Sequence, residues 1–96
     1  HLHPGDDVLV GGAVHVRLAA AMTGGAAPDS VEAMDLAEEH RTSIETFYDC
    51  GYGMHRGLGD MYVADERFTR TYEVLAPGLA QWLRDAIHAN ADRHEA

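Results

Sequence analysis

The sequence has no long hydrophobic run and almost no cysteine. No stretch approaches the roughly 20 apolar residues that a membrane-spanning helix needs, so the chain is not expected to cross a membrane. Residues 1–12 lack the basic start and the apolar run of a secretory signal peptide. The single cysteine, Cys50, excludes an internal disulfide and fits a reducing compartment. The cytoplasm is therefore the expected location.

Basic residues are also scarce. Seven Lys and Arg stand against 16 Asp and Glu, which gives a formal net charge of −9. Proteins that bind nucleic acid draw much of their affinity from cations that neutralise phosphates, and anionic membrane surfaces attract basic segments in the same way. DNA contact is therefore expected only through another domain, and no membrane partner is expected.

The length of 96 residues predicts a single domain. The first twelve residues, HLHPGDDVLVGG, show no helical period and are predicted to form a flexible tail with at most a short extended stretch at 8–10. The folded domain is predicted to span residues 13–96. His1 and His3 could contact a metal ion, but two ligands do not make a site, and no metal or cofactor is predicted.

Helical periodicity is what the sequence does have. Gly24-Gly25 can end a first helix, either Asp29 or Ser30 can cap the start of the second, and Asp65 can cap a later one. Apolar residues recur at helical spacing between these signals, which predicts an all-α domain of about five helices. The predicted helices span residues 13–22, 30–49, 54–62, 66–75 and 79 onward. The apolar stripe predicted for the longest helix contains Val31, Met34, Ala37, Ile44, Phe47 and Tyr48.

Cys50 and two histidines are the residues with possible chemistry. A reactive cysteine needs a cation or a helix N-terminus to lower its pKa, whereas Cys50 is predicted to follow the end of a long helix, where the dipole disfavours a thiolate. His40 and His55 lack the repeated spacing of helical metal sites and are predicted to be interior or cleft residues. Since no acid, base and nucleophile set stands out, an enzyme is not predicted.

Methionine and aromatic residues crowd residues 47–62, and such side chains make adaptable surfaces for large apolar ligands. Positions 50, 54, 57, 58 and 61 would share one face of a continuous helix, where Gly57 would leave a notch. Ordinary core packing explains the same pattern, so the residues alone leave both interpretations open.

Three blocks carry a family resemblance: AMDLAEEHR at 33–41, YDCGYGMHRGLGDMYVADERFT at 48–69 and PGLAQWLRDAIHANADRH at 77–94. They resemble the TipAS antibiotic-recognition domain family. The resemblance implies a globin-like helical fold that binds thiopeptides such as thiostrepton, or aromatic oligopeptides such as albicidin. It also implies that the domain follows a MerR-type DNA-binding module in a homodimeric regulator. The same resemblance implies that this chain begins late relative to the family's domain.

One departure from the family bears on the binding chemistry. The thiopeptide-binding prototype has a cysteine, in a stretch resembling HxCLGEMY, that adds to a dehydroalanine of the drug. The matching stretch here is HRGLGDMY, with Gly57 in place of that cysteine, whereas Cys50 matches the family's other cysteine. Reversible binding is therefore predicted.

Face geometry and resemblance together predict a reversible antibiotic-binding effector domain of a MerR-type regulator. A stand-alone drug-sequestering protein and an interaction module without a ligand remain alternatives. The His40 imidazole and the Tyr48 hydroxyl are expected to orient polar groups of the ligand, while the other predicted residues bury its rings. The predicted ligand-binding residues are His40, Ile44, Phe47, Tyr48, Cys50, Met54, Gly57 and Leu58.

Overall fold

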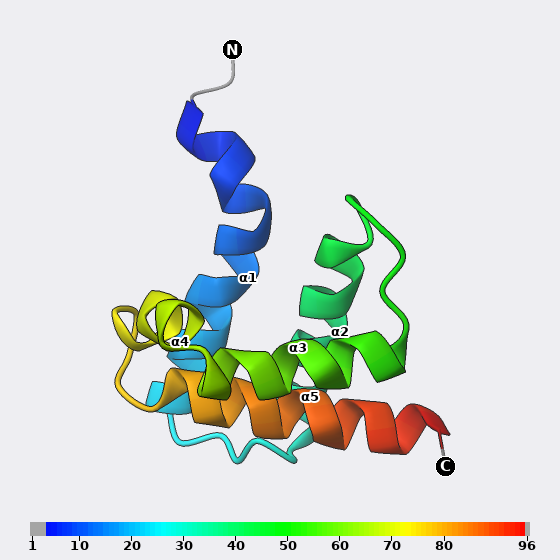
Figure 1. The fold of residues 1–96 in the computed structure, drawn as a ribbon. Helices are drawn as coiled ribbons and strands as arrows, with labels where there is room; N and C mark the ends of the chain where they lie inside the picture. Colours follow the sequence, from blue (N-terminus) through cyan, green and yellow to red (C-terminus); the bar gives the residue numbers. More distant parts are fainter. Residues whose placement is uncertain (1–3, 96) are drawn as a thin grey trace.

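The computed structural model describes residues 4–95, and these form five α-helices with no strand among them (Figure 1). The prediction of an all-α domain with about five helices is confirmed. The helices are α1 (Pro4–Thr23), α2 (Val31–Ile44), α3 (Tyr52–Ala64), α4 (Glu66–Glu73) and α5 (Leu79–Glu95).

Three helix boundaries follow the local signals in the sequence. Gly25 takes a φ of 97° just after α1, a backbone conformation that glycine adopts without a steric penalty. The Ser30 hydroxyl accepts a hydrogen bond from the Ala33 amide at 3.2 Å, and Asp65 accepts one from the Arg67 amide at 3.0 Å. Both side chains are N-caps, as predicted.

The first helix is longer than the sequence predicts, because it begins at Pro4 rather than at residue 13. Proline is favoured in the first turn of a helix, where its missing N–H is not needed. The prediction of an extended stretch at 8–10 is wrong, since these residues lie within α1. His1 and His3 lie outside the described residues, and the domain boundary at residue 12 stays a prediction.

The second helix is shorter than predicted, because it ends at Ile44 rather than at residue 49. The Ser43 hydroxyl donates to the His40 carbonyl at 2.7 Å, and such local bonds compete with the helix ladder. The β-branched Thr46 follows, and threonine has a low helix propensity. Residues 45–51 therefore form an irregular connection, which we call the 45–51 loop.

The face that α2 buries also differs from the predicted stripe. The buried residues are Ala33, Ala37 and His40, whereas Val31 is 66% exposed. Phe47 lies outside the helix and is 71% exposed. A shift by one or two positions along a helix turns a different face inward, and the small alanines allow α2 to pack closely on its neighbours.

The core forms around α5, whose apolar face is buried against the other helices. Helices α3 and α5 run antiparallel and side by side (Figure 1), with Arg56 bonded to Asp92 near one end and Asp60 to Arg84 further along. The Trp82 indole donates to the Ala26 carbonyl at 2.8 Å, which fixes the α1–α2 connection to α5. The buried residues of that face are Leu79, Trp82, Leu83, Ala86 and Ile87.

Two glycines of α3 have opposite surroundings. A Cβ at Gly59 would lie 3.3 Å from Ile87 Cδ1 and 3.4 Å from Arg84 Cα, so α3 and α5 approach closely there. A Cβ at Gly57 would meet nothing within 4 Å. Gly59 therefore permits helix packing, whereas Gly57 leaves open space on the surface.

These surroundings predict opposite effects of the same substitution. Gly59→Leu should lower the free energy of unfolding by about 1–3 kcal/mol, because the added side chain overpacks the α3–α5 contact. Gly57→Leu should leave stability unchanged or raise it by up to about 1 kcal/mol, because leucine is the better helix former. Urea denaturation of the two variants measures both, and equal stabilities would contradict the close contact.

Candidate functional site

The predicted site residues occupy two depths in the structure. Phe47, Tyr48, Met54 and Gly57 are exposed, with Tyr48 and Met54 each 50% exposed. Ile44 and Leu58 are half-buried, whereas His40 and Cys50 are buried. Six of the eight are therefore accessible to a ligand. We call them the loop–α3 surface: Ile44, Phe47, Tyr48, Met54, Gly57 and Leu58.

Three consecutive segments contribute to the loop–α3 surface. Ile44 ends α2, Phe47 and Tyr48 lie in the 45–51 loop, and the remaining residues lie in the first two turns of α3. The loop descends from the end of α2 to the start of α3, shown in green in Figure 1. The prediction that Cys50 shares a helix face with Met54 is wrong, because α3 begins only at Tyr52.

Arg41 of α2 binds the 45–51 loop at the end that leads into α3. Its guanidinium donates to the Cys50 carbonyl at 2.8 Å and lies 3.1 Å from a Glu45 carboxylate oxygen. It also pairs with Glu38 at 2.6 Å, and its central carbon lies 4.4 Å from the centre of the Tyr52 ring. The planar guanidinium can satisfy several acceptors at once and still stack on a ring.

Glu38 connects this arginine to α5. Its carboxylate accepts hydrogen bonds from the Asn90 amide at 2.9 Å and from the Tyr52 hydroxyl at 3.2 Å. The hydrogen bond from Arg41 is the main cause that lowers the pKa of Glu38 to about 2; Asn90 and Tyr52 act in the same direction, while burial opposes them. We call Glu38 and Arg41 the Glu38–Arg41 node.

The node is a functional feature that the sequence reasoning missed. An acidic and a basic residue three positions apart predict only a surface pair on one helix. The Arg41 side chain is instead 12% exposed, and Asn90 of α5 is fully buried. The signal that could have indicated it is Arg41 at the edge of the buried face of α2, one position after His40.

A chain of hydrogen-bonding rings lies beneath the surface. His40 Nδ1 is 2.9 Å from His55 Nε2, and His40 Nε2 is 3.4 Å from the Tyr72 hydroxyl. That hydroxyl is in turn 3.4 Å from His15 Nε2. The ring of Tyr62 packs on Tyr72, with centroids 4.8 Å apart. We call His15, His40, His55 and Tyr72 the histidine centre, which joins α1, α2, α3 and α4.

Burial keeps the histidine centre neutral. It lowers the pKa of His40 to about 3, helped by the neighbouring His55 and His15, and lowers that of His55 to about 4, helped by Arg41. The pKa of His15 is lowered by burial as well. His40 is 2% exposed, and both of its ring nitrogens have partners. The structure thus places His40 in the interior rather than on the loop–α3 surface.

Cys50 is shielded from reaction. Its side chain is fully buried, and burial raises the pKa of its thiol although Arg41 acts in the opposite direction. The sequence predicted an unreactive thiol for another reason, namely that Cys50 would follow the end of a long helix. In the structure Cys50 instead lies just before the start of α3. An unreactive cysteine therefore follows from burial.

Neither metal chemistry nor a membrane span is indicated in the part of the chain that the structure describes. Within it, no group of three or more histidine, cysteine or acidic side chains is arranged to hold a metal ion. No helix of that part is long and apolar enough to cross a membrane.

The helices and the histidine centre define a globin-like, all-α domain with exposed aromatic and methionine side chains and a small polar cluster buried beside its apolar core. The model of the TipAS antibiotic-recognition domain matches residues 11–90. The chain belongs to this family.

Relatives in sequence are transcriptional activators. The chain is 57% identical over 79 residues to the HTH-type transcriptional activator TipA of Streptomyces coelicolor, which covers 81% of this chain and 31% of that protein. It is 39% identical over 83 residues to the HTH-type transcriptional activator mta of Bacillus subtilis, which covers 85% of this chain and 32% of that protein. The chain thus spans about a third of the length of these curated relatives.

Two solved structures share the fold, and the globin-like prediction is confirmed. TipAS from Streptomyces lividans in complex with nosiheptide superposes with a TM-score of 0.83 at 52% identity, over 90% of this chain and 61% of that chain. The antibiotic-binding domain of a TipA-class multidrug resistance transcriptional regulator gives a TM-score of 0.78 at 53% identity, over 88% of this chain and 90% of that chain.

The histidine centre predicts that the protein loses stability in mild acid. His40 and His55 stay neutral in the folded chain down to about pH 5, whereas in the unfolded chain they take up protons near a pKa of about 6.5. The unfolded state then binds more protons, so the free energy of unfolding falls as the pH drops through this window. The expected loss between about pH 7.5 and 5 is about 2 kcal/mol for each of the two.

Urea denaturation at a series of pH values measures this slope. His40→Gln should remove about half of it, because one of the two buried histidines no longer titrates. A free energy of unfolding that stays flat between about pH 7.5 and 5 would contradict a neutral, buried histidine pair.

Proposed function

We propose that this chain is the antibiotic-binding effector domain of a MerR-type transcriptional regulator and that it binds bulky thiopeptides reversibly on the loop–α3 surface. The observation that carries the proposal is membership of an antibiotic-recognition family together with an exposed aromatic and methionine surface. DNA contact and dimerisation would belong to other parts of such a regulator. Ligand capture by this domain would bias the regulator between its two states.

The chemistry of the loop–α3 surface suits a thiopeptide. Phe47, Tyr48 and Met54 expose large apolar side chains, and a ligand that covers them would remove this apolar surface from water. Aromatic rings and a flexible thioether can pack against the rings of a macrocycle, and the Tyr48 hydroxyl can hydrogen-bond its amides. The structure of TipAS in complex with nosiheptide supplies the ligand class.

The absence of a thiol on this surface supports reversible binding. Gly57 stands where the resemblance places the family's reactive cysteine, and Cys50 is buried. Addition to a dehydroalanine needs an accessible thiolate near the alkene. Binding would then rest on packing and hydrogen bonds alone, and no turnover of the antibiotic is proposed.

In this proposal His40 and Cys50 do not contact the ligand but position residues that do. His40 would orient the residues above it through His55 and Tyr72, and Cys50 would hold the end of the 45–51 loop through its carbonyl bond to Arg41. Both are positioning residues. Their replacement should alter affinity by disturbing the surface.

Calorimetric titration with nosiheptide, thiostrepton and albicidin, followed by intact mass, tests the proposal. We expect saturable binding of at least one thiopeptide and an unchanged protein mass. Tyr48→Ala should weaken that binding by about 1–3 kcal/mol, whereas Val74→Ala, at a position 79% exposed just after α4, should not change it. Absence of heat with all three compounds would favour the interaction-module alternative.

A second variant locates the ligand. Gly57→Cys has room for its side chain, because nothing lies within 4 Å of a Cβ there. If the thiopeptide binds on the loop–α3 surface, the new thiol should add across a dehydroalanine: the S–C bond forms, the alkene is consumed and the thiol proton goes to the α-carbon. The expected result is a mass gain of one ligand in Gly57→Cys and none in the original chain. No gain in a variant that still binds the drug would place the ligand elsewhere.

A further inference from the structure

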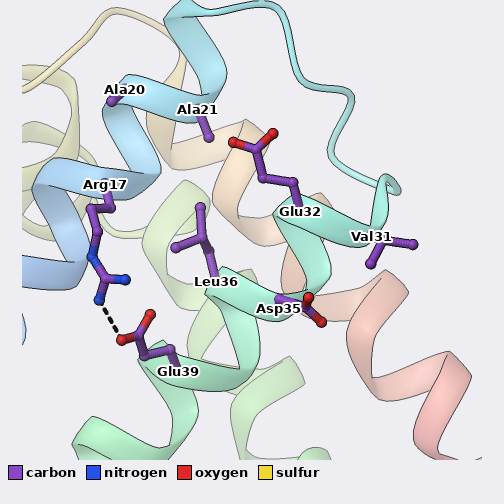
Figure 2. Close-up of a pocket in the computed structure, with 8 residues that line it drawn as sticks. All are labelled: Arg17, Ala20, Ala21, Val31, Glu32, Asp35, Leu36 and Glu39. Carbon is purple, nitrogen blue, oxygen red and sulfur yellow. Dashed lines mark hydrogen bonds and ion pairs between the residues drawn. The ribbon is translucent and has the colours of Figure 1, made fainter.

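A groove between α1 and α2 is not used by the proposed function. It is open to solvent, has a volume of about 710 Å³ and shares no residue with the loop–α3 surface. This volume falls in the range of about 300–1,000 Å³ that small-molecule sites occupy. Figure 2 shows the side chains that line it from both helices, with Leu36 at its middle.

The groove has an apolar floor. Ala20 and Ala21 contribute from α1, and Val31 and Leu36 from α2. Val31 is exposed and Leu36 is half-buried, so a ligand that lies on them would remove apolar surface from water. The small alanines of α1 leave the space that larger side chains would fill.

The rim of the groove is acidic. Glu32, Asp35 and Glu39 line it against a single guanidinium, that of Arg17. Glu32 has no ion-pair partner among the side chains that the structure describes, and in Figure 2 its carboxylate reaches from α2 toward α1. Asp35 pairs with Arg93 of α5 at the outer side. The excess of carboxylates favours a cation and disfavours an anion of the same shape.

The Arg17–Glu39 ion pair can open to admit such a cation. It bridges the two helices at one end of the groove (Figure 2), and its two side chains are about half exposed. Exposed ion pairs contribute little to stability, so a ligand cation can replace the guanidinium on Glu39 at small cost while Arg17 turns to solvent.

We infer that the α1–α2 groove is a second binding site, for drug-sized lipophilic organic cations. The rings of the cation would lie on Leu36, Val31 and the two alanines, and its charge would lie among the carboxylates of Glu32 and Glu39. This site is independent of the loop–α3 surface, so a cation and a thiopeptide can bind at the same time.

Tetraphenylphosphonium and tetraphenylborate form a matched probe pair, because they share shape and apolar surface and differ in the sign of the charge. In calorimetric titration at low ionic strength we expect saturable 1:1 binding of the cation and none of the anion. Glu32→Gln combined with Glu39→Gln should weaken cation binding about tenfold. Ala20→Leu should abolish cation binding, because the larger side chain fills the floor of the groove. Leucine is also a good helix former, so α1 should stay intact.

The matched control is Glu66→Gln combined with Asp92→Asn, which makes the same change in net charge on α4 and α5. It should change cation affinity less than twofold. A saturating amount of nosiheptide should not displace tetraphenylphosphonium. Equal binding of the anion or equal losses in the two double variants would overturn the α1–α2 site and would leave thiopeptide binding untouched. Displacement by nosiheptide would overturn the independence of the two sites and would place the thiopeptide in the groove instead of on the loop–α3 surface.

Discussion

The ion pair between Arg41 and Glu38 is the interaction on which the proposed binding surface depends. Backbone hydrogen bonds to the Ser43 and Ile44 carbonyls hold the first half of the 45–51 loop, whereas side chains bond the backbone of its far end, at Cys50. Arg41 bonds the Cys50 carbonyl, and Glu38 ties the pair to Asn90 of α5 and Tyr52 of α3. The exposed Phe47 and Tyr48 are thus held between the end of α2 and this anchor.

The anchor is a partly buried ion pair with neutral hydrogen-bond partners. The Arg41 and Glu38 side chains are 12% and 27% exposed, a depth at which an unpaired charge is costly. Each charge has its opposite within hydrogen-bond distance and additional neutral partners, which is the condition under which such a pair is tolerated. The arrangement fixes one loop conformation and leaves the apolar side chains of that loop free to face a ligand.

The histidine centre is a second group of buried polar side chains in the same domain. Three imidazoles and a tyrosine from four helices share hydrogen bonds where aliphatic side chains would pack without them. His55 Nδ1 is buried without a protein partner, so the interior is not fully satisfied. A domain with this interior depends on neutral histidines for stability and is sensitive to acid.

Local signals in the sequence predicted most of the fold, whereas the binding role of the candidate site residues stays a prediction. Ser30, Asp65 and Gly25 act within a turn of their own positions, and the apolar face of α5 repeats over several turns, so periodicity and capping rules apply to them. The end of α2 could not be predicted in this way, because it accompanies contacts of Arg41 with Cys50 and Glu45 that only the folded chain makes. Aromatic and methionine content indicated the exposed surface, but the depth of His40 and Cys50 depends on packing against α3, α4 and α5.

Hydrogen exchange at the 45–51 loop in Arg41→Met tests the role of the Glu38–Arg41 node most directly. Methionine keeps the aliphatic part of the side chain and removes the bonds to Cys50 and Glu38. The account predicts that the amides of Phe47, Tyr48 and Cys50 exchange about tenfold faster or more, while those of Leu83 and Ile87 in α5 change much less. Arg67→Met, which breaks an exposed pair with Asp65, should leave the loop unchanged. Loop amides that exchange at the original rate in Arg41→Met would contradict the account.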